Sequence, residues 1–425
     1  MTNNDLPRKL ADARQIAAVA TGFSLPFSTS GQAIAVSIFA VLALLTLDRD
    51  RFIATLRRPA AYLPVALFAL ILVGVLWSMQ PLSGAIRWVG PYAKLLLIPL
   101  VMATAFTPKQ ALQIAYGFLA ACICLLALSW AAFLWPTGPW GWFKAPGVPF
   151  KDNAVQSGCF ALCAFALAIG AMRIWVQDTR RAIAMIVLAL LFFADIFLIY
   201  VSKTGAIMAA ALLGLFVIHA GGWRRSAMVA VAAMIVIGIA LLTSPQAQRR
   251  IAEINSDINA NSGQTAGGET ISTASRLDFW SKAVGFVKAS PIAGHGTGSI
   301  KPLYQSMEAT KPSPYGQATP DPHNQTLHTV LQVGLIGGLL LWAMWIAHAR
   351  LFLARDYASI LGQAVVLQNV IGSLFNSHIS AVTQGMLYCL AVGLLGALVR
   401  NAPSGMTDRK PPTTSASATA SNNAA

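Results

Sequence analysis

Residues 182–201 read AIAMIVLALLFFADIFLIYV, and residues 204–221 read TGAIMAAALLGLFVIHAG, with only Ser202 and Lys203 between them. A helix that crosses the hydrocarbon core of a bilayer needs roughly 20 predominantly apolar residues, and each run is close to that length. So short a break between two such runs predicts a pair of antiparallel membrane helices joined by a tight turn. This stretch therefore predicts a helical membrane protein.

The rest of the chain repeats the pattern. Of its 425 residues, 56% are hydrophobic and 11% are charged, and the mean hydropathy is +0.62. A soluble domain carries about 25% charged residues, so lipid is the expected solvent here. The predicted membrane spans are 14–28, 30–47, 61–78, 86–106, 110–135, 153–175, 182–201, 204–221, 226–244, 325–348, 357–375 and 380–399.

These spans predict an all-α polytopic membrane protein of about twelve transmembrane helices, with one large external loop that itself contains helices. Residues 1–244 hold the first nine helices, residues 245–324 form the loop, and residues 325–400 hold the last three helices. The tail 401–425 is rich in Ser, Thr, Ala and Asn, which predicts a disordered cytoplasmic segment.

The distribution of basic residues predicts the orientation. The net charge is +15, and the basic residues stand between apolar runs, which favours membrane orientation and anionic lipid partners over nucleic acid. With the N-terminus inside, cytoplasmic segments hold about eighteen Arg and Lys residues and the short outer segments about five, as the positive-inside rule requires. Both termini are then cytoplasmic, and the long loop is outside.

Basic residues on the outer side depart from this rule, and they are candidates for ligand binding. Arg87 and Lys94 are seven residues apart, which on one α-helix puts them on one face about 10 Å apart. Lys94 would lie in hydrocarbon unless it faced a cavity or a ligand, and an ionisable residue there is a functional candidate. Lys203 lies in the break between two spans. Asp195, in the middle of the preceding run, could pair with a buried base.

The long loop contains a predicted amphipathic helix. Ser275 and Asp278 have the spacing of a capping box, with Ser275 as the N-cap. Arg276 would then be the first helical residue, at an electropositive helix N-terminus that suits an anion. The apolar residues that follow at helical spacing are Trp280, Ala283, Val284 and Val287.

The end of the loop carries a candidate general base. Residues 294–299 form a glycine-rich turn, but the turn lacks the strand and the lysine of a phosphate-binding loop. Pro320-Asp321-Pro322 constrains the backbone before His323, and a histidine at the outer surface suits proton transfer near pH 7. His328 follows five residues later on another helix face, so it does not complete a metal pair.

The Asp-x-Asp sequence at 48–50 falls in the cytoplasm, so the pattern favours metal-independent chemistry in which cations neutralise phosphate.

Short motifs follow one another in a fixed order along the second half of the chain. They are Ser275-Arg276 with Phe279-Trp280, then Pro291 with Gly294, Gly296 and Gly298, then His323-Asn324, and then Gly334 with Gly337. Their order resembles the shared signature of the O-antigen ligase and O-antigen polymerase superfamily. The helix layout and the place of the long loop are similar to that family as well, so the resemblance covers most of the chain.

The resemblance implies a GT-C-like fold and glycosyl transfer, without a cofactor, at the periplasmic face of a bacterial inner membrane. The donor would be O-antigen polysaccharide on undecaprenyl pyrophosphate, and in a ligase the acceptor is a sugar hydroxyl of lipid A–core. His323 matches the family's histidine, which would deprotonate that hydroxyl, and Arg276 matches the arginine that would hold the pyrophosphate. Lys203 stands where the family usually has arginine, so the charge is kept and the bidentate geometry is lost. Arg87 and Lys94 are further pyrophosphate candidates on charge placement alone.

A single displacement by an activated hydroxyl would invert the anomeric centre, and the sequence offers no paired carboxylates for a retaining route.

Other functions share parts of this pattern. An O-antigen polymerase or a protein O-glycosyltransferase would use the same donor. A transporter of anionic lipids is a different class, but transporters usually have repeated halves and polar residues near the midplane. Here no repeat is evident, and the polar groups concentrate at the outer face.

Overall fold

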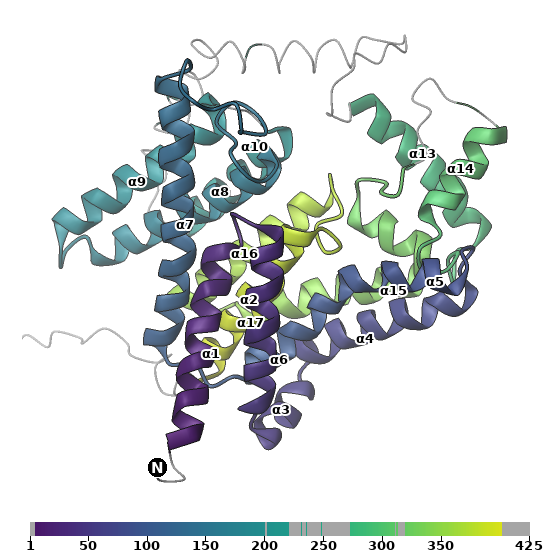
Figure 1. The fold of residues 1–425 in the computed structure, drawn as a ribbon, viewed down its shortest axis with the longest axis horizontal. Helices are drawn as coiled ribbons and strands as arrows, with labels where there is room; N and C mark the ends of the chain where they lie inside the picture. The colour runs from purple at the N-terminus through teal and green to yellow at the C-terminus, as the bar shows by residue number, and fades with distance from the viewer. Residues whose placement is uncertain are drawn as a thin grey trace, which may run out of the picture.

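The computed structural model describes residues 5–199, 202–220, 273–310 and 319–401, together with the single residues 231, 235, 248 and 312. Within these residues the chain consists of helices and connecting loops with no β-strand, which confirms the predicted all-α class (Figure 1). The predicted span 226–244, the first part of the long loop and nearly all of the predicted tail 401–425 lie outside the described residues.

The helices differ widely in length. The long ones are α1 (Asp5–Ser24), α2 (Thr29–Leu45), α4 (Pro59–Val73), α7 (Pro108–Leu134), α8 (Asn153–Ile174), α9 (Thr179–Leu198), α10 (Lys203–His219), α13 (Thr273–Ala289), α15 (Gln325–Leu351), α16 (Tyr357–Ser373) and α17 (Val382–Asn401). The short ones are α3 (Arg49–Leu56), the 3₁₀ helices η1 (Gly74–Trp77), η2 (Ile86–Trp88) and η3 (Gly90–Leu96), α5 (Leu82–Ala85), α6 (Leu97–Ala103) and α14 (Ile300–Thr310).

The helices pack around several apolar cores. One core joins α7, α8, α9, α10 and α16, and a second joins α4, η3, α6, α15, α16 and α17. A third lies between α1, α2 and α6. Helices α13 and α14 form a smaller core of their own, which reaches α15 through Leu331, and Figure 1 shows them together on one side of the bundle.

The described part of the chain does not confirm the count of about twelve membrane helices. Six of its helices are long and apolar enough to cross a membrane, or up to eight if each of two bent helix pairs is one span. Those six agree with the predicted spans 61–78, 110–135, 153–175, 182–201, 325–348 and 380–399. The predicted span 204–221 is the shorter apolar helix α10. Helix α1 begins at Asp5 and carries several charged residues in its first half, so the predicted span 14–28 is part of a longer and more polar helix.

Backbone chemistry explains the bent pairs. The predicted span 86–106 consists of η2, η3 and α6, with a bend of 43° between the helices around Gly90. Pro91 lies in the first turn of η3, where its missing N–H interrupts a continuous α-helix, and the segment is 3₁₀ helical up to Leu96 before α6 begins. The other pair, α2 and α3, turns by 110°, and Asp48 caps the second helix by accepting a hydrogen bond from Arg51 N at 3.0 Å.

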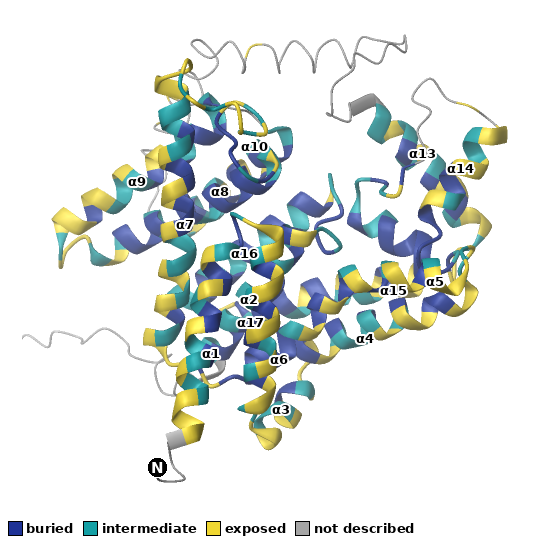
Figure 2. Ribbon diagram, in the orientation of Figure 1, coloured by how far each residue is buried: buried dark blue, intermediate teal, exposed yellow. Residues whose placement is uncertain are grey.

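The outward faces of several helices are apolar, as contact with lipid requires. On α2 the exposed stripe consists of Ile34, Ile38, Val41 and Leu45, each more than half exposed. Their spacing puts them on one side of the helix. Figure 2 shows further exposed residues along the outward sides of α7 and α9. A soluble monomer rarely exposes apolar surface this extensive, so the burial pattern supports a multi-pass membrane protein.

Helix α15 is broken in its middle, and the break receives the glycine-rich turn. Gly334 has φ 68° and ψ −171°, a backbone conformation essentially restricted to glycine. Leu335 N donates to the carbonyl of Pro291 at 2.8 Å. The segment just before the glycine-rich turn thus provides an acceptor for an N–H group that the break leaves without a partner inside the helix. A Cβ atom added at Gly334 would lie 1.8 Å from the carbonyl oxygen of Ile292. The close approach of the two backbones therefore requires glycine at this position.

We expect Gly334→Ala to lower the free energy of unfolding by on the order of 2 kcal/mol or more, because the new Cβ adds a steric clash to an unfavourable backbone conformation. Gly214→Ala is the matched control, since nothing lies within 4 Å of a Cβ added there in α10. That control should be neutral or more stable by about 0.5–1 kcal/mol. Thermal unfolding of both purified variants measures the difference, and equal melting temperatures would contradict the steric requirement.

Candidate functional site

His323 has an unusual backbone. Its φ is 54°, and among the described residues other than glycine no other φ is positive. Such a conformation costs about 1–2 kcal/mol for a residue with a side chain, so surrounding contacts must hold it. One of them is the hydrogen bond from His323 N to Asp321 Oδ1 at 2.8 Å. The next residue, Asn324, caps α15 by accepting from Leu327 N at 3.0 Å. His323 is therefore fixed between a turn and a capped helix start.

The imidazole of His323 lies between two other segments. Its Nδ1 is 3.1 Å from Oδ1 of Asn376, a residue in the turn that follows α16. An amide oxygen only accepts, so Nδ1 carries a proton in this contact, and in the neutral form of the ring Nε2 is then the acceptor. The ring also stacks on Phe279 of α13, with 6.3 Å between centroids and 23° between planes. Because the residue is only half-buried, Nε2 can receive a proton from a ligand.

Asp321 ties these segments together. Its Oδ1 accepts a second hydrogen bond, from Ser377 Oγ at 2.6 Å, so the carboxylate bridges the start of α15 and the turn after α16. The segment is also fixed to α13, because Trp280 Nε1 donates to the carbonyl of Pro322 at 2.9 Å. In α13, Lys282 pairs with Asp278 at 2.8 Å and with Glu308 of α14.

Arg276 lies on α13 with an uncommitted donor. Its Nε is buried and has no hydrogen-bond partner among the described residues. Burial lowers the pKa of Arg276, and the nearby carboxylate of Asp321 opposes that shift. An arginine keeps its charge at any physiological pH, so a positive guanidinium with a free donor stands beside the histidine segment. This arrangement suits an anionic ligand.

The predicted start of the loop helix is wrong. Helix α13 already includes Thr273, so Ser275 is not its N-cap and Arg276 lies within the first turn rather than at its first position. The buried face consists of Phe279, Ala283 and Phe286, whereas the predicted face member Val284 is 47% exposed. The helix N–H groups lie one turn further back than predicted, so at Arg276 only the side chain, and not the helix N-terminus, is available to a ligand.

The glycine-rich turn is a structural element. Four successive backbone N–H groups donate to carbonyl or amide oxygens of the membrane helices: those of His295 to Leu331, Gly296 to Gln332, Thr297 to Gly74 and Gly298 to the Gln332 side chain, at 2.8–3.0 Å. A phosphate-binding loop needs such groups free. The turn therefore docks the loop onto α15 and η1, and its histidine bonds to the carbonyl of Phe286 through Nε2 at 2.9 Å.

Arg87 and Lys94 do not share a face of one α-helix. Arg87 lies in η2 and is exposed, whereas Lys94 lies in η3 beyond the bend and is only 8% exposed. The ammonium of Lys94 donates to the carbonyl oxygens of Ser380 at 3.2 Å and Ala381 at 2.5 Å. Two of its three donors are thus occupied by the backbone before α17, and its role at a pyrophosphate stays a prediction.

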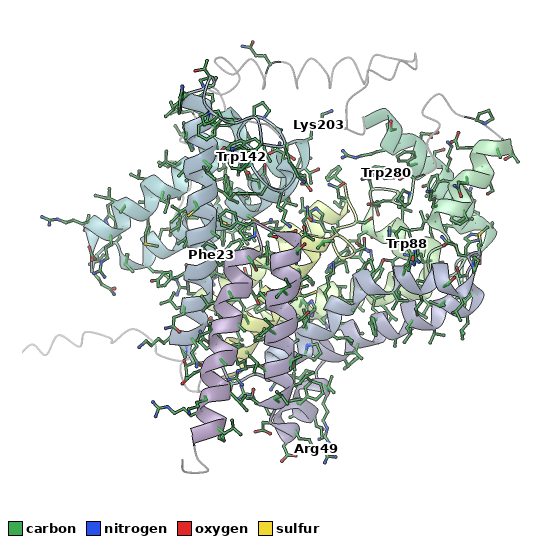
Figure 3. The ribbon with its side chains drawn as sticks, viewed as in Figure 1. Phe23, Arg49, Trp88, Trp142, Lys203 and Trp280 are labelled. Atoms are coloured by element: carbon green, nitrogen blue, oxygen red, sulfur yellow. The ribbon has the colours of Figure 1, made fainter. Side chains whose placement is uncertain are left out.

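Lys203 and Asp195 lie around the turn between α9 and α10. Lys203 is the first residue of α10 and follows the N-cap Ser202, whose side chain accepts from Gly205 N. Figure 3 shows Lys203 and Trp280 at one end of the molecule and Arg49 at the opposite end, near the N-terminus. Asp195 is buried in α9, and its Oδ2 has no partner among the described residues, so the predicted pairing with a buried base is not found there.

Sequence reasoning missed the polar residues that support the site. Asn376 and Ser377 lie in a short polar break between two apolar runs, which was the available signal. Gln325 also went unnoticed, although it is fully buried. Its side-chain oxygen accepts from Ile379 N at 2.8 Å, and its nitrogen donates to Tyr92 OH at 3.3 Å. His328 belongs to the same buried network, with its Nδ1 2.9 Å from Tyr92 OH.

Comparison with known proteins supports the resemblance. Residues 165–342 match the family model described as O-antigen ligase. No curated protein matches the chain. The matched range contains Lys203, Arg276 and His323, while Arg87, Lys94 and Asn376 lie outside it.

The helical membrane fold and this match support a multi-pass membrane protein with a function of the O-antigen ligase and polymerase kind. Residues 165–342, less than half of the chain, are similar to the O-antigen ligase family.

We expect Lys94→Met to lower the free energy of unfolding by about 1–3 kcal/mol, because it removes both hydrogen bonds from the buried ammonium to the carbonyl oxygens of Ser380 and Ala381. Arg87→Met should have almost no effect, since Arg87 is exposed. The melting temperatures of the two purified variants test this contrast. A stable Lys94→Met protein would show that the two carbonyl contacts contribute little.

Proposed function

We propose that this protein is an O-antigen ligase that moves O-antigen polysaccharide from undecaprenyl pyrophosphate to a sugar hydroxyl of lipid A–core. The observation that carries the proposal is the arrangement of His323, whose Nδ1 contacts Asn376 while Arg276 offers a buried, unpartnered donor on the neighbouring helix. A base and a cation side by side are what transfer from a pyrophosphate to a hydroxyl needs.

His323 acts as the general base in this mechanism. With the proton on Nδ1 donated to Asn376 Oδ1, the lone pair of Nε2 accepts the proton of the acceptor hydroxyl. A sugar hydroxyl is a poor nucleophile, so its deprotonation in the transition state lowers the barrier. The Asn376 contact and the Phe279 ring keep the imidazole in one orientation.

The cations bind the donor's leaving group. Arg276 contacts the pyrophosphate through its free donor, and Lys203 adds a second charge from the start of α10. Arg87 and Lys94 are further contributors, Lys94 with its one remaining donor. Charge neutralisation makes pyrophosphate a good leaving group, and fixed cations in a site shielded from water do this efficiently. The hydroxyl then attacks the anomeric carbon as the pyrophosphate leaves, which inverts that centre in one step.

The predicted topology indicates on which side of the membrane the reaction takes place. The charge distribution puts both termini in the cytoplasm and the α13–α14 layer in the periplasm of the inner membrane. Lipid-linked polysaccharide and lipid A–core then meet as two membrane lipids at one outer face.

Lipopolysaccharide immunoblots of a deletion strain test the function. For a ligase, polymer should disappear from lipid A–core and persist on the lipid carrier, and the wild-type chain should restore it. Single repeats attached to the core would instead identify a polymerase. Normal lipopolysaccharide with an unglycosylated protein substrate would identify a protein glycosyltransferase. Either of these results would overturn the ligase assignment.

We expect His323→Ala to reduce transfer by about 10²–10⁴-fold while donor binding survives, because the base is lost and the cations remain. Asn376→Ala should cause a smaller loss in kcat with little change in the donor KM. Asn376→Asp keeps an acceptor for the Nδ1 proton but favours the imidazolium form, so it should shift the pH dependence of kcat to higher pH. Transfer and donor binding are measured on the same detergent-purified variants. A His323→Ala protein with most of its rate would remove His323 from the mechanism.

For the cations, we expect Arg276→Ala and Lys203→Ala to raise the donor KM and lower transfer by tenfold or more, since a hydrogen bond to a charged group contributes about 1.5–3 kcal/mol. Lys203→Arg should retain activity because it keeps the charge and adds bidentate geometry. Lys301→Ala, on α14, is a control for general loss of positive charge. Near-normal transfer by both alanine variants at normal protein level would exclude these residues from the donor site.

A further inference from the structure

A large apolar cavity lies in the bundle, separate from the candidate site. Its volume is about 760 Å³, and its walls come from α1, α7, α8, α9, α16 and α17, with smaller contributions from α2 and α6. No residue of α13, α14 or the segment 319–324 lines it. A cavity of this size is comparable to those that hold whole small-molecule ligands.

The cavity opens toward the surface that the apolar pattern assigns to lipid. Leu112 and Tyr116 of α7 line it and are 46% and 58% exposed. Ala184 of α9 also lines it and is exposed. The opening therefore lies between α7 and α9, two helices that are long and apolar enough to cross a membrane. Acyl chains of the surrounding bilayer have direct access to it.

Two arginines are the only charged residues in the lining, and no acidic residue lines the cavity within the described part of the chain. They are Arg173, near the end of α8, and Arg181, near the start of α9, so both belong to one end of the cavity. Arg173 is held in place, since its Nη2 donates to the carbonyl of Arg355 at 2.6 Å and its guanidinium lies 5.5 Å from the ring centroid of Tyr357. Arg181 pairs through Nε with Asp178 at 3.0 Å.

We propose that this cavity binds an anionic phospholipid, with its acyl chains between the helices and its phosphodiester headgroup against Arg173 and Arg181. Protein interiors are close-packed, and an apolar space does not hold water, so acyl chains are the filling that a bilayer supplies. Basic pockets between membrane helices at the cytoplasmic side suit anionic headgroups. The predicted topology puts both arginines in the cytoplasm, on the opposite side of the membrane from the proposed pyrophosphate site, so the bound lipid is distinct from the donor.

Thermal unfolding of the full chain, purified in detergent and delipidated, tests the proposal with three probes. Phosphatidylglycerol should raise the melting temperature by a few degrees, because a ligand that binds only the folded state stabilises it. Phosphatidylcholine, with no net charge, should raise it much less, and inorganic phosphate should leave it unchanged. Native mass spectrometry before delipidation should show retained anionic phospholipid. Equal responses to the two lipids, or a response to phosphate alone, would overturn the proposal, as would a retained polyprenyl lipid in place of a phospholipid.

Three variants locate the binding site. Arg173→Gln and Arg181→Gln should each reduce the response to phosphatidylglycerol toward that to phosphatidylcholine. Arg180→Gln is the matched control, because Arg180 is an exposed neighbour that does not line the cavity, and its response should equal that of the wild type. Ala166→Phe, which fills the cavity from α8, should abolish the response to both lipids. If the arginine variants responded like Arg180→Gln, the proposal would fail even where Ala166→Phe did not fold. None of these measurements depends on the proposed transfer reaction.

Discussion

The carboxylate of Asp321 is the contact on which the geometry of the candidate site depends. One of its oxygens accepts from the backbone N–H of His323 at 2.8 Å and from the Ser377 hydroxyl at 2.6 Å. Its charge also acts on Arg276 of α13, where it favours the protonated guanidinium. Three segments that are distant in sequence meet at this acid, and together they offset the conformational cost of the left-handed His323 backbone. A carboxylate that already accepts two hydrogen bonds organises the site without serving as the base.

The loop helices are fixed to the membrane helices by backbone contacts rather than by side-chain packing alone. At the break of α15, the turn 294–299 donates to the carbonyl oxygens of Leu331 and Gln332, and the carbonyl of Pro291 accepts from Leu335 N. Trp280 adds a bond to the carbonyl of Pro322 on the other side of α13. Because α13 is held at two places, Arg276 and the Phe279 ring keep a defined position relative to His323. A base and a cation that act on one substrate need this rigidity.

Hydropathy was sufficient to predict the fold class and six of the membrane spans, and motif order named His323 and Arg276 as candidates. They failed where hydrogen bonding decides the structure. The run around Pro91 is apolar enough to cross a membrane, but η2 and η3 are 3₁₀ helices with a bend between them, and Arg87 and Lys94 lie on opposite sides of that bend. The partner of the histidine, Asn376, is 53 residues away in the chain, and no local pattern indicates such a contact. Pairings of this kind depend on tertiary packing, which a single sequence does not encode locally.

The choice of asparagine beside the histidine has a chemical consequence. A carboxylate at Nδ1 would favour the imidazolium form, and a protonated ring cannot accept a proton from a sugar hydroxyl. The amide of Asn376 orients the ring without supplying that charge, while the acid of the site, Asp321, accepts from a backbone N–H and a hydroxyl. The charge of Asp321 favours the protonated form of Arg276. In the proposed reaction, a pyrophosphate would bind beside the same cation, and the imidazole would use the lone pair of Nε2 to take the proton of the acceptor hydroxyl.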